Sequence, residues 1–442
     1  MLISFVGMFV YSKSIPVALV SLYIASWFLP QGIKIVGTSV GFPSILGISG
    51  FLYFLYFHYK ISVNQMCNRN LIYKSFKYVI ILLIFFILIA LMSTKIPIKE
   101  QFDSIKGFLY YSVNIILAAS CFNEKRDFNC LCNYVILLLI ISGIYGIYTY
   151  VTLYNPFAEY VILTHSLFED QGMSDEIFNT ERGFIHARIS GFTVHPLLYG
   201  GVLVLCFYLL MLNFINIARG WRKLFLALVL SFCLILIILT GSRSILIGLL
   251  CGVVYYFTKM YPHKMVRCVI LGIAFFMIFG LTIEDEFIRS VLFFWEDNEE
   301  IKGSSSSMRI NQIEAAFDVI SNDFQSFLFG FGNGWCARYV LKYGNIPPFQ
   351  GFEGVFISSL VEFGVLGMIL YIISLFPPLY RLNSKEVINP KFHILINSFL
   401  LSGFIIYSFT GTAYGLRLYV VLTFLIIKYS LICNELPNKI NV

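Results

Sequence analysis

The chain has 442 residues, of which 58% are hydrophobic and only 12% are charged. A soluble domain cannot bury so much apolar surface, and several apolar runs exceed the roughly 18 residues that mark a membrane span. The composition therefore excludes a soluble enzyme and indicates a polytopic membrane protein. The net charge of +7 follows from where the basic residues lie and requires no nucleic-acid partner.

The apolar runs are continuous rather than alternating, which predicts an all-α bundle and not a membrane barrel. We expect about 12 transmembrane helices, near residues 15–30, 42–59, 77–94, 104–122, 130–152, 195–215, 223–240, 244–258, 266–283, 354–379, 393–410 and 414–433. About nine of them would form a bundle over residues 1–283, interrupted by an outer loop near 153–194. A long loop over 284–353 and the last three spans over 354–442 would follow.

The basic residues predict the orientation of these spans. With the amino terminus inside, every short inner connection contains Lys or Arg, as the positive-inside rule requires. Both termini then lie in the cytoplasm, and the two long loops are extracytoplasmic. The N-terminus has no basic region followed by a cleavage site, so we expect its first span to be retained.

The run from Leu224 to Phe257 contains one charged residue, Arg243. The run is longer than the roughly 20 residues that cross one bilayer. A single over-long helix would put Arg243 in the hydrocarbon interior, whereas two short helices would put it in the turn between them. The orientation favours a turn at Gly241–Arg243, on the outer face.

The long loop 284–353 is expected to contain an amphipathic helix. Ile310, Ile313, Phe317 and Ile320 would share one face, which would pack along the membrane surface. Glycines at positions 330, 332 and 334 follow and indicate a tight turn.

Arginines and carboxylates near the outer ends of spans are the candidates for chemistry. Arginine makes bidentate contacts with phosphate oxygens, and several arginines together would suit a diphosphate. The alternative is that each is an interfacial anchor for lipid headgroups. The candidates are Arg188, Arg243, Arg309 and Arg417 for binding, with Glu353 and Glu362 as carboxylates.

Histidine and cysteine residues do not predict a metal site. His195 precedes Pro196 at the start of a span, and no His pair has metal-ligand spacing. Cys130 and Cys132 have no second ligand pair. We expect no metal and no other cofactor.

Four segments resemble the O-antigen polymerase and ligase superfamily of bacterial inner-membrane glycosyltransferases. They are ARISGFTVHPLLYGG (187–201), TGSRSILIGLL (240–250), MRINQIEAAFDVISNDFQSFLFGFGNGW (308–335) and FEGVFISSLVEFGVLG (352–367). Each is similar to a family motif, and they occur in the family's order over roughly residues 180 to 370. In the ligases of this family a histidine stands nine residues before the glutamate of the last motif. Here that position is Glu353, which favours the polymerases.

The resemblance implies a reaction at the outer face of the inner membrane. The donor is a growing glycan on undecaprenyl diphosphate, and the acceptor is a hydroxyl of a lipid-linked repeat unit. Arg188, Arg243, Arg309 and Arg417 would bind the diphosphate, and Glu353 would act as general base. His195 and Glu362 would support the site. The expected partners are these lipid-linked oligosaccharides and membrane lipid, with a chain-length regulator as a further candidate.

Two other functions remain open at this point. An O-antigen ligase would use the same donor and pass the finished glycan to a different acceptor. A flippase or transporter of lipid-linked oligosaccharide is disfavoured, because transporters hold their chemistry near the midplane and keep their loops short. The sugars, the linkage and the kind of glycan (O-antigen, capsule or exopolysaccharide) are not encoded in these patterns.

Overall fold

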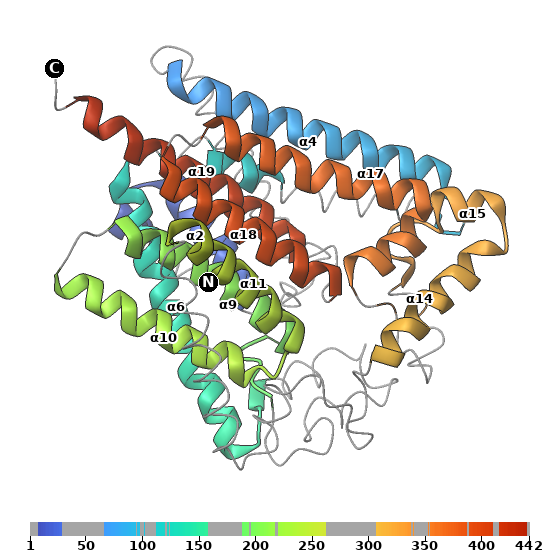
Figure 1. The fold of residues 1–442 in the computed structure, drawn as a ribbon, viewed down its shortest axis with the longest axis horizontal. Coiled ribbons are helices and arrows are strands. Elements are labelled where there is room, and N and C mark those ends of the chain that lie inside the picture. The colour runs from blue at the N-terminus through green and yellow to red at the C-terminus, as the bar shows by residue number, and fades with distance from the viewer. Residues whose placement is uncertain are drawn as a thin grey trace.

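A computed structural model describes most of the chain. It covers residues 8–28, 66–93, 95–97, 101, 112–119, 122, 124–157, 188–193, 196–216, 220–261, 306–336, 339, 352, 354–386, 389–409 and 415–439. Every regular element within these residues is a helix (Figure 1).

The principal helices follow the apolar runs of the sequence. They are α2 (Ile15–Phe28), α4 (Met66–Met92), α6 (Lys125–Thr152), α9 (Pro196–Asn216), α10 (Trp221–Leu239), α11 (Arg243–Met260), α14 (Ser306–Ser321), α15 (Phe324–Phe329), α17 (Val355–Glu386), α18 (Pro390–Phe409) and α19 (Gly415–Lys439).

Seven of the described helices are long and apolar enough to cross a membrane: α4, α6, α9, α10, α11, α17 and α18. Two shorter apolar helices, Val17–Phe28 and Leu418–Cys433, lie within α2 and α19. The prediction of a polytopic helical membrane protein is confirmed. Of the 12 expected spans, 42–59 and 266–283 lie outside the described residues, and the span at 104–122 is described as a helix over 112–119.

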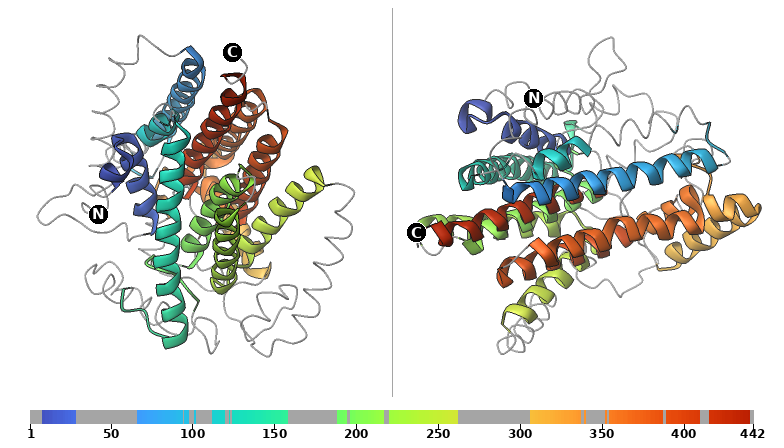
Figure 2. Two further views of the ribbon diagram at one scale, coloured as in Figure 1. Left: turned by 90° about the vertical axis from the view of Figure 1, so that its left-hand side faces the viewer. Right: turned by 90° about the horizontal axis from the view of Figure 1, so that it is seen from above.

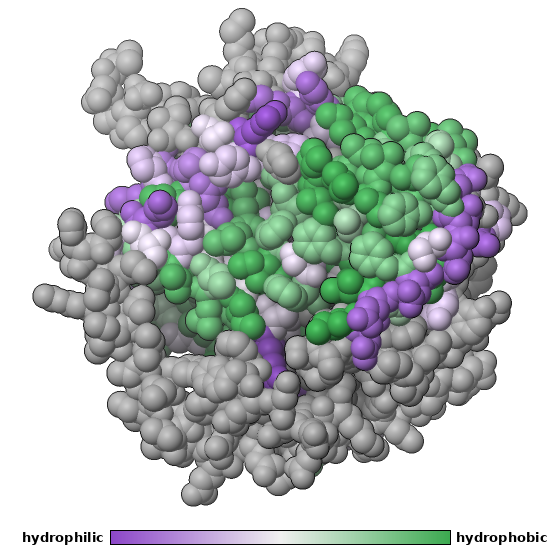
Figure 3. All heavy atoms as spheres, turned by 45° about the vertical axis from the view of Figure 1, so that its right-hand side comes forward, coloured by the Kyte–Doolittle hydropathy of each residue, from purple (hydrophilic) through white to green (hydrophobic). Residues whose placement is uncertain are grey.

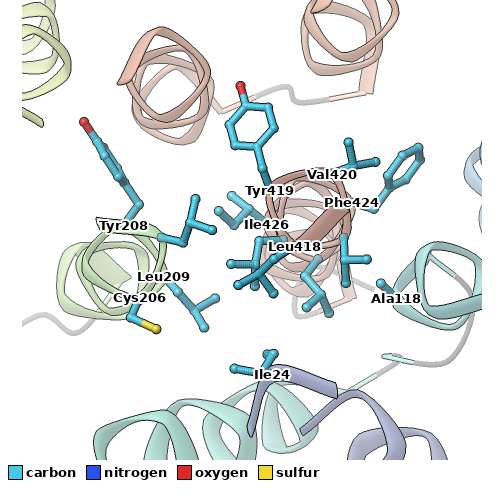
Figure 4. Packing of buried hydrophobic residues seen from close by; sticks show 14 of the residues in the cluster. Ile24, Ala118, Cys206, Tyr208, Leu209, Leu418, Tyr419, Val420, Phe424 and Ile426 are labelled. Atoms are coloured by element: carbon cyan, nitrogen blue, oxygen red, sulfur yellow. The ribbon is translucent and has the colours of Figure 1, made fainter. Parts of the chain in front are cut away.

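The core of the bundle forms around α19. Its residues from Leu418 to Ser430 are buried on every side, and most of them are apolar, as expected for a helix in the core. Figure 4 shows side chains of α19 directed toward Tyr208 and Leu209 of α9 on one side and toward Ile24 of α2 on another. The surrounding helices therefore separate α19 from lipid.

Helices α11 and α18 pack closely against each other. A Cβ atom on Gly248 would lie 3.0 Å from the carbonyl oxygen of Ser402, and one on Gly252 would lie 2.7 Å from that of Ser398. The hydroxyl groups of Ser402 and Ser398 donate to the carbonyls of Gly248 and Gly252, at 2.7 and 2.5 Å. The order of these contacts shows that the helices are antiparallel.

Helices α14 and α15 lie past the end of α4 and pack against the first part of α17 (Figures 1 and 2). In Figure 1, α14 runs across the direction of α4. The expected amphipathic helix is therefore present, but its four predicted residues are not equally exposed. Ile320 is buried, whereas Ile310, Ile313 and Phe317 are exposed. The spacing places four apolar residues along one side of the helix. It does not show which of them contact protein and which contact lipid.

Candidate functional site at one end of the bundle

The apolar run 224–257 divides at a tight turn, as predicted. Helix α10 ends at Leu239 and α11 begins at Arg243. Gly241 has a φ of +61°, a left-handed conformation that glycine adopts without a steric penalty. Arg243 is half-buried in the first turn of α11, so its charge stands at a helix end.

The second predicted arginine, Arg188, lies at the same turn. Its Nε donates a hydrogen bond of 2.8 Å to the carbonyl oxygen of Thr240. The backbone N–H of Ile189 donates to the carbonyl of Leu239 at 3.2 Å. A hydrogen bond from a charged group contributes about 1.5–3 kcal/mol. The segment before α9 is thus fixed to the end of α10, and the structure places Arg188 and Arg243 on the same turn.

Side chains from α6 fix the other flank of this segment. The Tyr145 hydroxyl donates to Oδ1 of Asn155 at 2.8 Å, and Nδ2 of Asn155 donates to the Ser190 hydroxyl at 3.1 Å. The rings of Tyr145 and Phe192 stack with centroids 4.3 Å apart. Arg188 therefore belongs to a segment that is fixed from both α6 and α10.

Several helices begin at this end of the molecule. The hairpin of α10 and α11 places the first residues of α9 and α11 at the same end. The antiparallel pairing with α11 brings the last turn of α18 there as well, and a Cβ on Gly354 would lie 2.8 Å from the carbonyl oxygen of Ser408 near that last turn. Helix N-termini carry partial positive charge and attract anions. The starts of α9, α11, α17 and α19 thus lie at the same end of the bundle as the two arginines.

The Gly-rich turn packs against a break in α17. Gly364 has a φ of +68° inside this helix and interrupts its regular course. The backbone N–H groups of Phe331 and Gly332 donate to the carbonyls of Val361 and Glu362, at 3.1 and 2.9 Å. A Cβ on Gly330 would lie 2.5 Å from the backbone of Glu362. Glycine at position 330 is therefore required for the main chains to approach so closely.

The carboxylate of Glu362 is buried beneath this turn. Its Oε1 accepts a hydrogen bond of 3.3 Å from the backbone N–H of Cys336, and the N–H of Gly334 also faces the carboxylate. Glu362 therefore closes the contact between the Gly-rich turn and α17. The supporting role that the sequence predicts for Glu362 stays a prediction.

Two titratable groups on either side of the Gly-rich turn have structural roles. Burial, together with the adjacent Glu362, raises the pKa of the Cys336 thiol well above its usual value, so the thiol stays protonated. The Ser326 backbone N–H, which Asp323 caps at the start of α15, lowers the pKa of the Asp323 carboxyl. Neither environment is that of a nucleophile.

The described residues account for part of the predicted site. Arg188 and Arg243 lie at the same turn, and Glu362 lies beneath the Gly-rich turn. The backbones of Arg309 and Arg417 are placed in α14 and in the first turn of α19, but their side chains lie outside the description. Glu353 and His195 also lie outside the described residues. Among the residues described, no group of three or more His, Cys, Asp or Glu could hold a metal ion.

Two features that shape this end could not be found from the sequence. One is the bond from Arg188 to the Thr240 carbonyl, because a backbone acceptor leaves no mark in the sequence. The other is the break at Gly364, whose only signal is a glycine within an apolar run.

The fold defines a membrane protein with a cationic turn and a Gly-rich loop at one end of a helical bundle. Residues 226–372 match the family model Wzy_C, described as O-antigen ligase. This part of the chain is a domain of the O-antigen ligase and polymerase family, whose members are membrane enzymes that transfer glycans. The matched region contains Arg243, Arg309, Glu353 and Glu362, whereas Arg188, His195 and Arg417 lie outside it. The search of curated proteins found no match.

Replacement of Glu362 tests its hydrogen bonds to the backbone N–H groups of Gly334 and Cys336. We expect Glu362→Leu to lower stability by about 1–3 kcal/mol, because two buried N–H groups lose their acceptor. Glu362→Gln keeps a carbonyl oxygen and should lose less. The measurement is the apparent melting temperature of the purified protein in detergent, with the exposed residue change Glu314→Gln as control. Wild-type melting of Glu362→Leu would contradict the structural role.

Proposed function

We propose that the protein is a repeat-unit polymerase of a bacterial surface polysaccharide. It would transfer a growing glycan from undecaprenyl diphosphate to a lipid-linked repeat unit at the outer face of the inner membrane. The observation that carries this proposal is the Arg188–Arg243 turn at the end of the bundle. Family membership of residues 226–372 supports the use of lipid-linked glycans as substrates.

The chemical step is a substitution at the anomeric carbon of the donor. The acceptor hydroxyl attacks that carbon, a new glycosidic bond forms, and the bond to the diphosphate oxygen breaks with its electron pair. Negative charge therefore develops on undecaprenyl diphosphate as it leaves. Fixed guanidinium groups and helix N-termini next to this charge lower the barrier, because they need no reorganisation during the reaction.

Arg188 and Arg243 are proposed to bind the diphosphate, with Arg309 and Arg417 completing the site. Arg417 lies in the first turn of α19, which begins at the same end of the bundle. Glu353 is proposed to accept the proton of the acceptor hydroxyl. The next residue, Gly354, lies against the end of α18, at the end of the bundle where α11 begins. His195, just before α9, is proposed as a supporting residue.

The ligase is the second candidate, because the matching family model is described by that activity. Glu353 at the position of the ligase histidine favours the polymerase. A deletion strain separates the two functions. Surface lipid with a single repeat unit marks a polymerase, whereas intact lipid-linked polymer without surface attachment marks a ligase. Accumulation of lipid-linked units on the cytoplasmic side would instead indicate the third function, a flippase.

Alanine variants of the two arginines test the diphosphate site. We expect Arg243→Ala and Arg188→Ala each to lower glycan polymerisation by about 10²-fold or more, the cost of losing one fixed donor to a developing anion. The measurement is the glycan ladder restored in a deletion strain, with expression checked by blotting. Arg222→Ala, an exposed arginine at the opposite end of α10, is the control. Full-length ladders from both variants would exclude the proposed site.

A second test concerns Glu353. The change Glu353→Gln preserves the size of the side chain but removes its ability to accept a proton. We expect the ladder to shorten to single repeat units while the protein level stays unchanged. Wild-type chain lengths from Glu353→Gln would remove this residue as the base.

A further inference from the structure

The surface of α14 divides into three strips. One strip contains Gln312, Ala316 and Ile320, all 0% exposed, and these residues are spaced one helical turn apart. Helix α14 packs against α17 and α15. This strip is the side of α14 that contacts the rest of the protein.

The second strip is apolar and exposed. Ile310, Ile313 and Phe317 are 56%, 44% and 45% exposed, and their spacing places them side by side along the helix. The third strip is polar and includes the exposed residues Glu314 and Asp318. At about 100° per residue, the apolar strip falls between the buried strip and the polar strip.

The apolar strip adjoins a surface that faces lipid. The outward residues of α4 and α17 are apolar and exposed, as expected for helices of membrane-spanning length. At the end of α4, Nε2 of Gln325 donates to the Met92 carbonyl at 3.2 Å, and the neighbouring Phe324 is 76% exposed. Figure 3 shows a broad apolar surface bordered by a hydrophilic strip on this side of the molecule.

We propose that α14 lies in the outer boundary of the membrane, with Ile310, Ile313 and Phe317 inserted among lipid acyl chains. Its polar strip faces water, and its buried strip faces α17. A second copy of the chain fits this strip less well. Three half-exposed side chains present roughly a few hundred Å², which is below the ~1,000 Å² of a specific interface. Membrane lipid is therefore the occupant.

This placement would fix the depth of the outer loop. The loop is hydrogen-bonded to α17 through the Gly-rich turn and to α4 through Gln325. An inserted α14 would add a third attachment, to lipid at headgroup level. The proposal stands independently of the reaction, because it depends on exposure and periodicity alone.

Tryptophan substitution at adjacent positions tests the insertion. Phe317→Trp and Asp318→Trp would be compared in liposomes of phosphatidylethanolamine and phosphatidylglycerol, after subtraction of the wild-type spectrum. We expect brominated acyl chains to quench Phe317→Trp at least twofold more than Asp318→Trp. Aqueous acrylamide should quench Asp318→Trp more strongly.

The pair Ile313→Trp and Glu314→Trp repeats the comparison one turn earlier, in case one variant fails to fold. Equal quenching by acrylamide within both pairs, with no effect of brominated lipid, would overturn the proposal. Protection of Phe317→Trp and Ile313→Trp from both quenchers would also overturn it, because it would show that protein covers this strip. Since neither measurement involves glycan, failure here leaves the polymerase proposal standing.

Discussion

The cost of placing a guanidinium group in hydrocarbon determines where this protein can put its arginines. A charged side chain at the centre of a bilayer costs at least about 2.5 kcal/mol. The run from Leu224 to Phe257 avoids this cost by breaking at Gly241 and placing Arg243 at a helix start. The same break leaves the Thr240 carbonyl available to Arg188. This turn therefore keeps Arg243 out of the hydrocarbon interior and places both arginines at the same end of α10.

The Gly-rich turn and the broken helix α17 form the second fixed structure at this end. Their contact is made by main chains, which approach closely because Gly330 and Gly364 lack side chains. The buried carboxylate of Glu362 completes the contact through the N–H of Cys336. The Gly-rich turn is therefore held on a helix of membrane-spanning length.

Elements that depend on local physics could be predicted from the sequence. Hydropathy predicts the helices, and charge cost predicts the turn at Arg243. Contacts between distant backbones could not be predicted, since nothing in FGFGNGW identifies the carbonyls of Val361 and Glu362 as its acceptors. The burial of Ile320 could not be predicted, because lipid and the protein interior select the same apolar residues. The roles of Glu353 and His195 stay predictions.

The most direct test of the account is whether the α10–α11 turn binds a lipid diphosphate. Binding of undecaprenyl diphosphate to the purified protein can be measured by native mass spectrometry, with undecaprenyl monophosphate for comparison. We expect tighter binding of the diphosphate and a loss of about tenfold or more in Arg243→Gln, the effect of one charge-assisted hydrogen bond of ~1.5 kcal/mol or above. Equal binding of both lipids, unchanged in Arg243→Gln, would contradict the account.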